Sequence, residues 1–200
     1  MKYTAGLLRV ANARLVILML CLLTGPALKR SAAQALCQPK ELIILTKSEV
    51  IKTLQSFDKA NGDNLGIWHP GFPLLHVNQS SPLQGPNVQC SLHFMTQGLE
   101  KIKEDQKTDL NPKDVSLDKL FKETIFRVNM LAICVKSVLG GECSNEPFPP
   151  NMPKHTFEKK QWSHTLLKSA RDYLAWMQHR FKPTSVKERF KYLSGSQHQL

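Results

Sequence analysis

Four separate stretches of this sequence carry hydrophobic residues at steps of three and four, the spacing that places side chains on one face of an α-helix. They cover about residues 39–59, 88–106, 116–139 and 157–181. In the third stretch, for example, the stripe runs through Leu117, Phe121, Thr124, Val128, Leu131, Val135 and Val138. Such stripes are explained by a packed core and need no cofactor behind them. The pattern therefore predicts an all-α fold of four helices around one core.

The three connections between these helices differ in length. Residues 60–87 and 140–156 are long and rich in turn-forming residues, whereas 107–115 is short. A short link makes neighbouring helices antiparallel and a long link permits parallel ones, so this order predicts an up-up-down-down bundle with two long crossover loops. The pattern "TKSE" at 46–49 resembles a capping box, which marks Thr46 as a place where the first helix could break or restart.

The first 35 residues differ from the rest of the chain. A basic start precedes the uninterrupted apolar run "LVILMLCLL" at 15–23, which has signal-peptide length and is too short to span a bilayer. We expect cleavage after Ala35, with Ala27 as the alternative site. The protein is therefore expected to be secreted and not inserted in a membrane, with a helical domain over 36–182 and a basic tail over 183–200.

The charge of the chain limits its classes of partner. Residues 1–35 contain five basic and no acidic residues, so their removal lowers the formal net charge from +11 to +6. This excess lacks the dense clustering of a nucleic-acid-binding protein, and no nucleic acid is expected as a partner. The most concentrated basic patch is "KERFKY" at 187–192. We interpret it as a solvated tail, with binding of acidic polysaccharide as the alternative.

Secretion also decides how the cysteines are interpreted. Cys21 leaves with the signal peptide, and an even number of cysteines remains for an oxidising compartment, so two disulfides are expected among Cys37, Cys90, Cys134 and Cys143. In the up-up-down-down topology all four lie at the same end of the bundle. No pair has C-x-x-C spacing and the seven histidines are scattered, so neither a metal site nor a cofactor is expected.

Short motifs point to modification and not to catalysis. The triplet "NQS" at 78–80 makes Asn78 a glycan acceptor in a secreted loop. The sequence contains no G-x-S-x-G, no H-E-x-x-H and no phosphate-binding glycine loop. It also lacks the calcium loop and the cysteine density of small secreted phospholipases. We therefore do not expect an enzyme.

Phe157 opens the fourth helical stretch and does not follow its stripe. An α-helix turns about 100° per residue, so Phe157, nine residues before Leu166, lies roughly 180° from the core side. Lys160 lies within roughly 60° of Phe157. The two are predicted to form an outward patch, and an aromatic side chain beside a cation is common at binding hot spots. The alternative is a first-turn residue folded under the 140–156 loop.

The residues of this fourth helix carry a resemblance to a known family. The stretch "FEKKQWSHTLLKSARDYLAWMQHRF" (157–181) resembles the last helix of the leukemia inhibitory factor and oncostatin M family. It shares the first phenylalanine, the lysine three residues on, a Leu-Leu pair and a closing phenylalanine. "EDQKTDLNPKDVSLDKL" (104–120) is similar to the second crossover region of that family, and "LCQPKELIIL" (36–45) to its first helix.

This resemblance implies a long-chain four-helix cytokine of the interleukin-6 type. Such a protein is secreted, is a monomer before it binds, and assembles cell-surface receptor chains to trigger intracellular signalling. The resemblance assigns Phe157 and Lys160 to contact with the leukemia inhibitory factor receptor chain. It places a second surface, for the shared chain glycoprotein 130, on the first and third helices. Our candidates there, chosen from exposed helical positions, are Lys52, Gln55, Lys59, Lys122 and Arg127.

The resemblance also bears on the disulfides. It implies the pair Cys37–Cys134, which leaves Cys90 with Cys143. Members of the family have a cysteine at the position of His164, so the partner of Cys90 must differ in this chain.

A second resemblance provides the alternative. "QCSLHFMTQGL" (89–99) looks like the second helix of interleukin-6, granulocyte colony-stimulating factor and the interleukin-23 alpha subunit. The alternative is thus another long-chain helical cytokine, with Trp162 as the candidate contact instead of Phe157. The broad class of function is the same, but the receptor partner differs.

Overall fold

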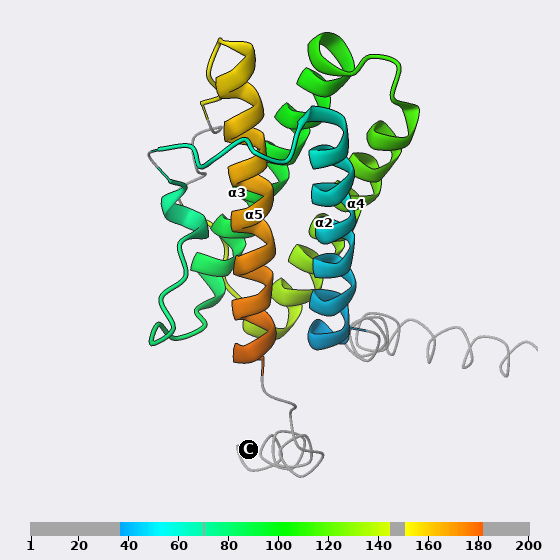
Figure 1. Ribbon diagram of the computed structural model, residues 1–200. Helices are drawn as coiled ribbons and strands as arrows, with labels where there is room; N and C mark the ends of the chain where they lie inside the picture. Colours follow the sequence, from blue (N-terminus) through cyan, green and yellow to red (C-terminus); the bar gives the residue numbers. More distant parts are fainter. Residues whose placement is uncertain (1–36, 70, 145–150, 182–200) are drawn as a thin grey trace, which may run out of the picture. The chain divides into compact units, whose positions relative to one another are not determined.

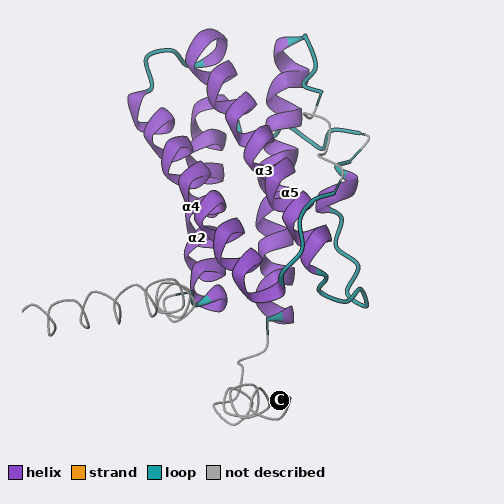
Figure 2. Ribbon diagram, turned by 180° about the vertical axis from the view of Figure 1, so that it is seen from behind, coloured by secondary structure: helices purple, strands orange, loops and turns teal. Residues whose placement is uncertain are grey.

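Four long helices make up most of the computed structural model, which describes residues 37–69, 71–144 and 151–181. They are α2 (Pro39–Asn61), α3 (Gly85–Asp105), α4 (Val115–Leu139) and α5 (Thr156–Arg180) (Figure 1). A 3-10 turn, η1 (Pro73–Leu75), precedes α3, and a π-helical turn, η2 (Gln106–Leu110), follows it. No strand occurs in the described ranges (Figure 2). The prediction of an all-α fold with four helices is confirmed.

The compact unit that holds these helices is Pro39–Leu200, which is separate from a unit over Met1–Gln38. The predicted signal peptide, its cleavage sites after Ala27 or Ala35, and the tail at 183–200 lie outside the described residues.

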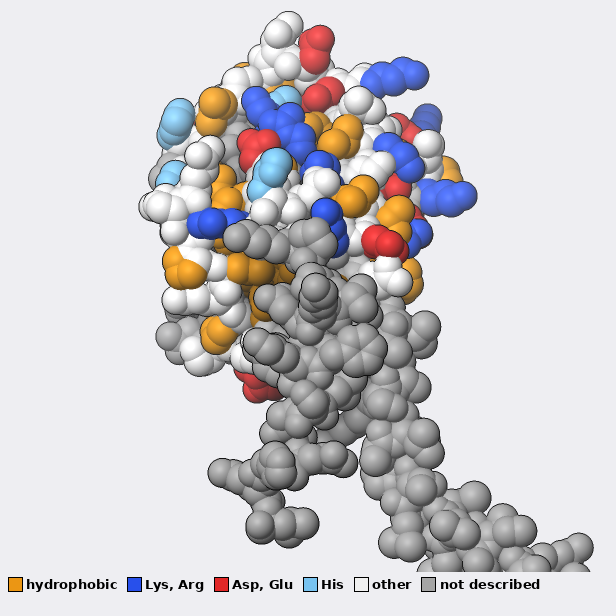
Figure 3. Space-filling model, turned by 90° about the horizontal axis from the view of Figure 1, so that it is seen from below, with side chains coloured by type: hydrophobic (Ala, Val, Ile, Leu, Met, Phe, Trp, Pro, Cys, Tyr) orange, Lys and Arg blue, Asp and Glu red, His pale blue; other side chains and the backbone are white. Residues whose placement is uncertain are grey.

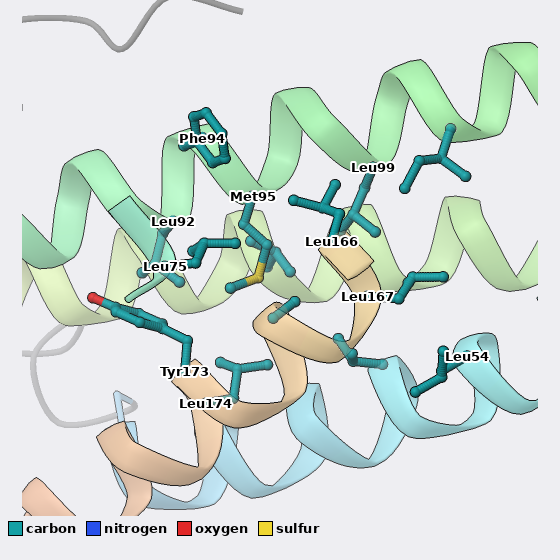
Figure 4. Packing of buried hydrophobic residues seen from close by; sticks show 14 of the residues in the cluster. Leu54, Leu75, Leu92, Phe94, Met95, Leu99, Leu166, Leu167, Tyr173 and Leu174 are labelled. Atoms are coloured by element: carbon teal, nitrogen blue, oxygen red, sulfur yellow. The ribbon is translucent and has the colours of Figure 1, made fainter. Parts of the chain in front are cut away.

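The helices pack around one hydrophobic core. Helix α2 lies against both α4 and α5, while α3 packs mainly against α4 and less extensively against α5. Figure 4 shows Met95 and Leu99 of α3 in the core together with Leu166 of α5. With one exception, the hydrophobic stripes predict the buried residues correctly, and the core includes Ile43, Val50, Leu54, Phe57, Val88, Leu92, Ile102, Phe121, Val128, Leu131, Ala170, Tyr173 and Met177.

Two details of the helices differ from expectation. Val138 was expected in the core but is 50% exposed, because it lies in the last turn of α4, one residue before the helix ends. The predicted break near Thr46 is wrong, since α2 runs without interruption through it. The Thr46 hydroxyl is fully buried and donates a hydrogen bond to the Leu42 carbonyl at 2.7 Å, so the polar group is satisfied within the helix.

Side-chain and backbone contacts join specific ends of the helices. Asn61, the last residue of α2, donates from Nδ2 to Oε1 of Gln106 at 3.0 Å, directly after α3. The start of α3 approaches the end of α4 so closely that a Cβ atom on Gly85 would stand 2.2 Å from the Gly140 carbonyl oxygen. This separation is below any real contact, so Gly85 is required where the two helix ends meet.

One predicted disulfide is present and closes this same junction. Cys90 in α3 is bonded to Cys143 beyond α4, with their Cα atoms 4.9 Å apart. Cys37 and Cys134 are also disulfide-bonded.

The pairing of Cys37 with Cys134 stays a prediction that peptide mapping can check. Digestion without reduction is expected to give one linked peptide pair containing Cys37 and Cys134 and a second containing Cys90 and Cys143. Reduction before digestion is the control and should abolish both linked pairs. A peptide that joins Cys134 to Cys143 would contradict the assignment.

Candidate functional site

Phe157 lies in the first turn of α5 and points away from the core. Its side chain is 60% exposed, whereas Leu166 and Ala170 on the opposite side of the helix are fully buried. Lys160 follows almost one turn later and is partly exposed. The outward direction of Phe157 is therefore confirmed, and an apolar ring is presented to solvent beside a cation. The role of this pair in binding stays a prediction.

Trp162 belongs to the core and not to this surface. It is only 1% exposed, and its ring meets that of Phe72 edge-on, with centroids 5.3 Å apart and planes at 89°. A side chain in this position cannot touch a partner unless the core opens. The alternative that makes Trp162 the contact residue is therefore not supported by its position.

The segment between α2 and η1 lies along the same part of α5. Gln161 donates from Nε2 to the Leu65 carbonyl at 3.0 Å. The Trp68 backbone N–H donates to Oγ1 of Thr165 at 2.8 Å. Ile67, between these two contacts, is 56% exposed. The exposed surface along the first turns of α5 is therefore built from two segments that are distant in the sequence.

Lys159, next to Lys160 in the sequence, has quite different surroundings. Its Nζ lies 2.5 Å from Oδ1 of Asp105 and 2.7 Å from Oδ2 of Asp109. The hydrogen bonds to Asp105 and then to Asp109 raise the pKa of the Lys159 amine, and the bond from Lys159 lowers the pKa of Asp109. The stability that the Asp109 carboxylate contributes is lost only as pH falls through its lowered pKa. The stability that the Lys159 amine contributes is lost only as pH rises through its raised pKa, so Lys159 and Asp109 are both ionised at neutral pH.

The five candidates for the second surface are spread over α2 and two sides of α4. Lys52, Gln55 and Lys59 are exposed along α2, as expected. Lys122 pairs with Asp118 at 2.6 Å, and the charges of Lys103 and Lys107 also lower the Asp118 pKa, so this part of α4 faces the end of α3. Arg127 pairs with Glu123 at 2.8 Å, and its carbonyl lies 3.5 Å from the Thr46 hydroxyl of α2. These residues do not form one compact cluster.

An exposed apolar stripe on α4 was missed at the level of the sequence. Phe126, Met130 and Ile133 follow one another at steps of four and three, with exposed fractions of 54%, 40% and 66%. The signal was present, because this is the same helical spacing that identified the core stripe. The buried stripe on the other side of the helix is longer, and the helical spacing was therefore assigned to the core alone.

His164 of α5 lies against α2. Its Nδ1 atom lies 2.8 Å from Oδ1 of Asp58, and its side chain is nearly buried. This polar contact ties α5 to α2. The sequence of α5 contains no cysteine, and Cys90 is bonded to Cys143.

Asn78 is exposed in the loop after η1, where a glycan could be attached. Its Oδ1 accepts hydrogen bonds from the Ser80 backbone N–H at 3.0 Å and the Ser80 hydroxyl at 2.7 Å. We expect protein from eukaryotic cells to shift to lower apparent mass after glycosidase treatment. Asn78→Gln is the control and should migrate at the lower position from the start. A wild-type band that does not shift would contradict the prediction.

The remaining surface carries no further constellation that identifies a chemistry. Among the described residues, no group of three or more His, Cys, Asp or Glu could hold a metal ion, and no helix is long and apolar enough to cross a membrane. Figure 3, a view from below Figure 1, shows Lys and Arg side chains interspersed with acidic and hydrophobic ones on the described part of that face.

Comparisons with known proteins add no assignment. No protein-family model, no curated protein and no solved structure gives a significant match to this chain.

Proposed function

We propose that this protein is a secreted cytokine that binds and assembles cell-surface receptor chains. The observation that carries the proposal is Phe157, a large aromatic side chain that is 60% exposed beside Lys160 at the start of α5. Burying such a ring is favourable on a partner, and hot spots are enriched in aromatic anchors. The partner proposed for this pair is a receptor chain of the leukemia inhibitory factor receptor type.

The up-up-down-down connection is part of the same proposal. It is supported by the Asn61–Gln106 contact, which pairs the end of α2 with the end of α3. The Lys159–Asp105 contact pairs the start of α5 with the end of α3, and Cys90–Cys143 pairs the start of α3 with the segment after α4. Parallel α2 and α3, with α4 and α5 antiparallel to them, satisfy all three contacts. The long connections at 62–84 and 140–155 are then the two crossover loops.

A second receptor contact is proposed on α2 and α4, for a chain of the glycoprotein 130 type. Among the exposed residues of α4, the stripe of Phe126, Met130 and Ile133 offers apolar area that the charged candidates lack. Lys122 and Arg127 are each already engaged in an ion pair within α4. We therefore propose that the apolar stripe supplies the centre of this contact and that the cations lie at its rim.

The proposal is tested by measuring binding of the secreted protein to receptor ectodomains. We expect binding to a leukemia inhibitory factor receptor-type chain, and a larger assembly when a glycoprotein 130-type chain is added. Binding only to receptors of interleukin-6, granulocyte colony-stimulating factor or interleukin-23 would favour the alternative cytokine class. Absence of binding to every cytokine receptor chain would contradict the proposal.

A further inference from the structure

Two adjacent lysines near the start of α5 have different surroundings: one faces solvent and the other pairs with carboxylates of the fold. Lys160 belongs to the outward patch with Phe157. Lys159 is turned by about 100° from Lys160 and pairs with two carboxylates of the α3–η2 segment. Only 18% of the Lys159 side chain is exposed, so it is not presented to a partner in the way that Phe157 is.

The first turn of α5 has no side-chain cap, and Glu158 is the acidic residue in it that interacts favourably with the helix dipole. His155 stands at its N-cap position and makes no side-chain capping hydrogen bond. In α4, by contrast, the Asp114 carboxylate accepts from the Leu117 backbone N–H at 2.9 Å. A lysine so close to a helix N-terminus is also unfavourable with respect to the helix dipole. The order of this turn therefore depends on contacts with other parts of the fold in addition to the local effect of Glu158.

The carboxylates that bind Lys159 are themselves rigidly placed. Asp105 is the last residue of α3 and its side chain is only 6% exposed. The Oδ1 atom of Asp105 accepts from the Lys159 amine, whereas its Oδ2 atom is buried without a hydrogen-bond partner. Loss of the lysine would leave a buried carboxylate without its cation, which is costly.

The turn that carries Asp109 is fixed to α2 by side-chain amides. Gln106 Oε1 accepts from Asn61 Nδ2 at 3.0 Å and from Asn111 Nδ2 at 2.7 Å. Asn111 Nδ2 also donates to Oδ1 of Asn61 at 3.0 Å. These amides fix the turn η2 to the end of α2, and Lys159 of α5 pairs with Asp105 and Asp109 of the same α3–η2 segment.

We propose that Lys159 is a positioning residue, which orders the first turn of α5 so that Phe157 and Lys160 are presented for receptor binding in one conformation. This inference rests on the proposed function for its receptor part. A helix start that is ordered for only part of the time binds with an apparent affinity reduced by that fraction. The reduction appears in the association rate, because the complex, once formed, contains the ordered turn in either case.

The test combines amide hydrogen exchange of the free protein with receptor-binding kinetics. Lys159→Met keeps the apolar stem and removes the cation. We expect at least about threefold faster exchange at the amides of residues 159–162, which begin with the Lys159 N–H bonded to the His155 carbonyl. The association rate is expected to fall about three- to tenfold, with the dissociation rate unchanged.

Two further variants separate positioning from general stability. Lys159→Arg keeps the charge and the donors, so it should restore wild-type exchange and association. Lys136→Met is the matched control, since Lys136 pairs with Glu142 at 2.5 Å after α4, and it should leave both measurements unchanged. If Lys159→Met does not fold, Asp109→Asn removes the exposed carboxylate and should show the same changes in weaker form.

Each outcome decides between the two proposals. Unchanged exchange in Lys159→Met would overturn the positioning role. A faster dissociation rate with unchanged exchange would also overturn it, because that result means direct contact between Lys159 and the receptor. The third outcome is that Lys159→Met exchanges faster but the wild-type protein binds no receptor chain. That outcome would overturn the proposed function, while the role of Lys159 in ordering the turn would stand.

Discussion

Phe157→Ala is expected to weaken binding to the receptor chain by about 2–4 kcal/mol and to leave the melting temperature nearly unchanged. The ring is 60% exposed in the free protein, so its removal opens no cavity in the core. In the complex the same ring would be desolvated, and its truncation would then remove the apolar area that drives association. Receptor titration and thermal unfolding of the same variant measure the two effects.

Lys160→Ala serves as the companion to this variant. It should weaken binding as well, with an effect that shrinks at high salt if the amine meets a carboxylate at the rim of the contact. A Phe157→Ala protein that loses stability while its folded fraction keeps full affinity would show that Phe157 is a structural residue. The receptor assignment of the start of α5 would then have to be abandoned.

Trp162→Ala is expected to have the opposite signature, with a loss of about 3–5 kcal/mol in the free energy of unfolding. The indole is 1% exposed and lies edge-on against Phe72, so truncation leaves a cavity that the surrounding helices can fill only in part. Receptor affinity per folded molecule should stay close to that of the wild type. Denaturant unfolding gives the first quantity, and titration at a temperature where the variant is folded gives the second.

The Trp162→Phe variant is the control for size and aromatic character. It should recover most of the stability, because an aromatic ring still fills the site. If instead Trp162→Ala keeps its stability and loses affinity, Trp162 is a contact residue. That result would favour the alternative class of helical cytokine over the leukemia inhibitory factor type.

The helices and the core could be read from the sequence because burial repeats with the helical period. Each predicted stretch matches an observed helix with ends that differ by at most a few residues, and the direction of Phe157 followed from rotation about the helix axis. The prediction that Val138 is buried is wrong, because the spacing of a hydrophobic stripe does not show at which residue other parts of the fold stop covering the helix. The prediction of a helix break at Thr46 is wrong, because packing of the long amphipathic stretch outweighs the local capping pattern. The buried Thr46 hydroxyl donates to the Leu42 carbonyl and does not cap a new helix.

The polar contacts at the helix ends could not be predicted in the same way. The pairing of Lys159 with Asp105 joins residues 54 positions apart, and Asp109 in the π-helical turn η2 pairs with the same amine. Helix rotation separates the directions of Lys159 and Lys160, but it does not show that the partners of Lys159 are Asp105 and Asp109. The helical spacing of the exposed stripe on α4 could be seen in the sequence. Its exposure could not be predicted, because both sides of that helix are apolar and the spacing does not show which one is buried.

The bond between Cys90 and Cys143 turns α3, η2 and α4 into a closed covalent ring. The link between Leu110 and Asp114, in which Pro112 and Lys113 are exposed, can therefore be cut without dividing the molecule. A protease that nicks it would leave two polypeptides that migrate together until a reductant separates them. A single cut at this link therefore leaves α3 and α4 joined through Cys90 and Cys143.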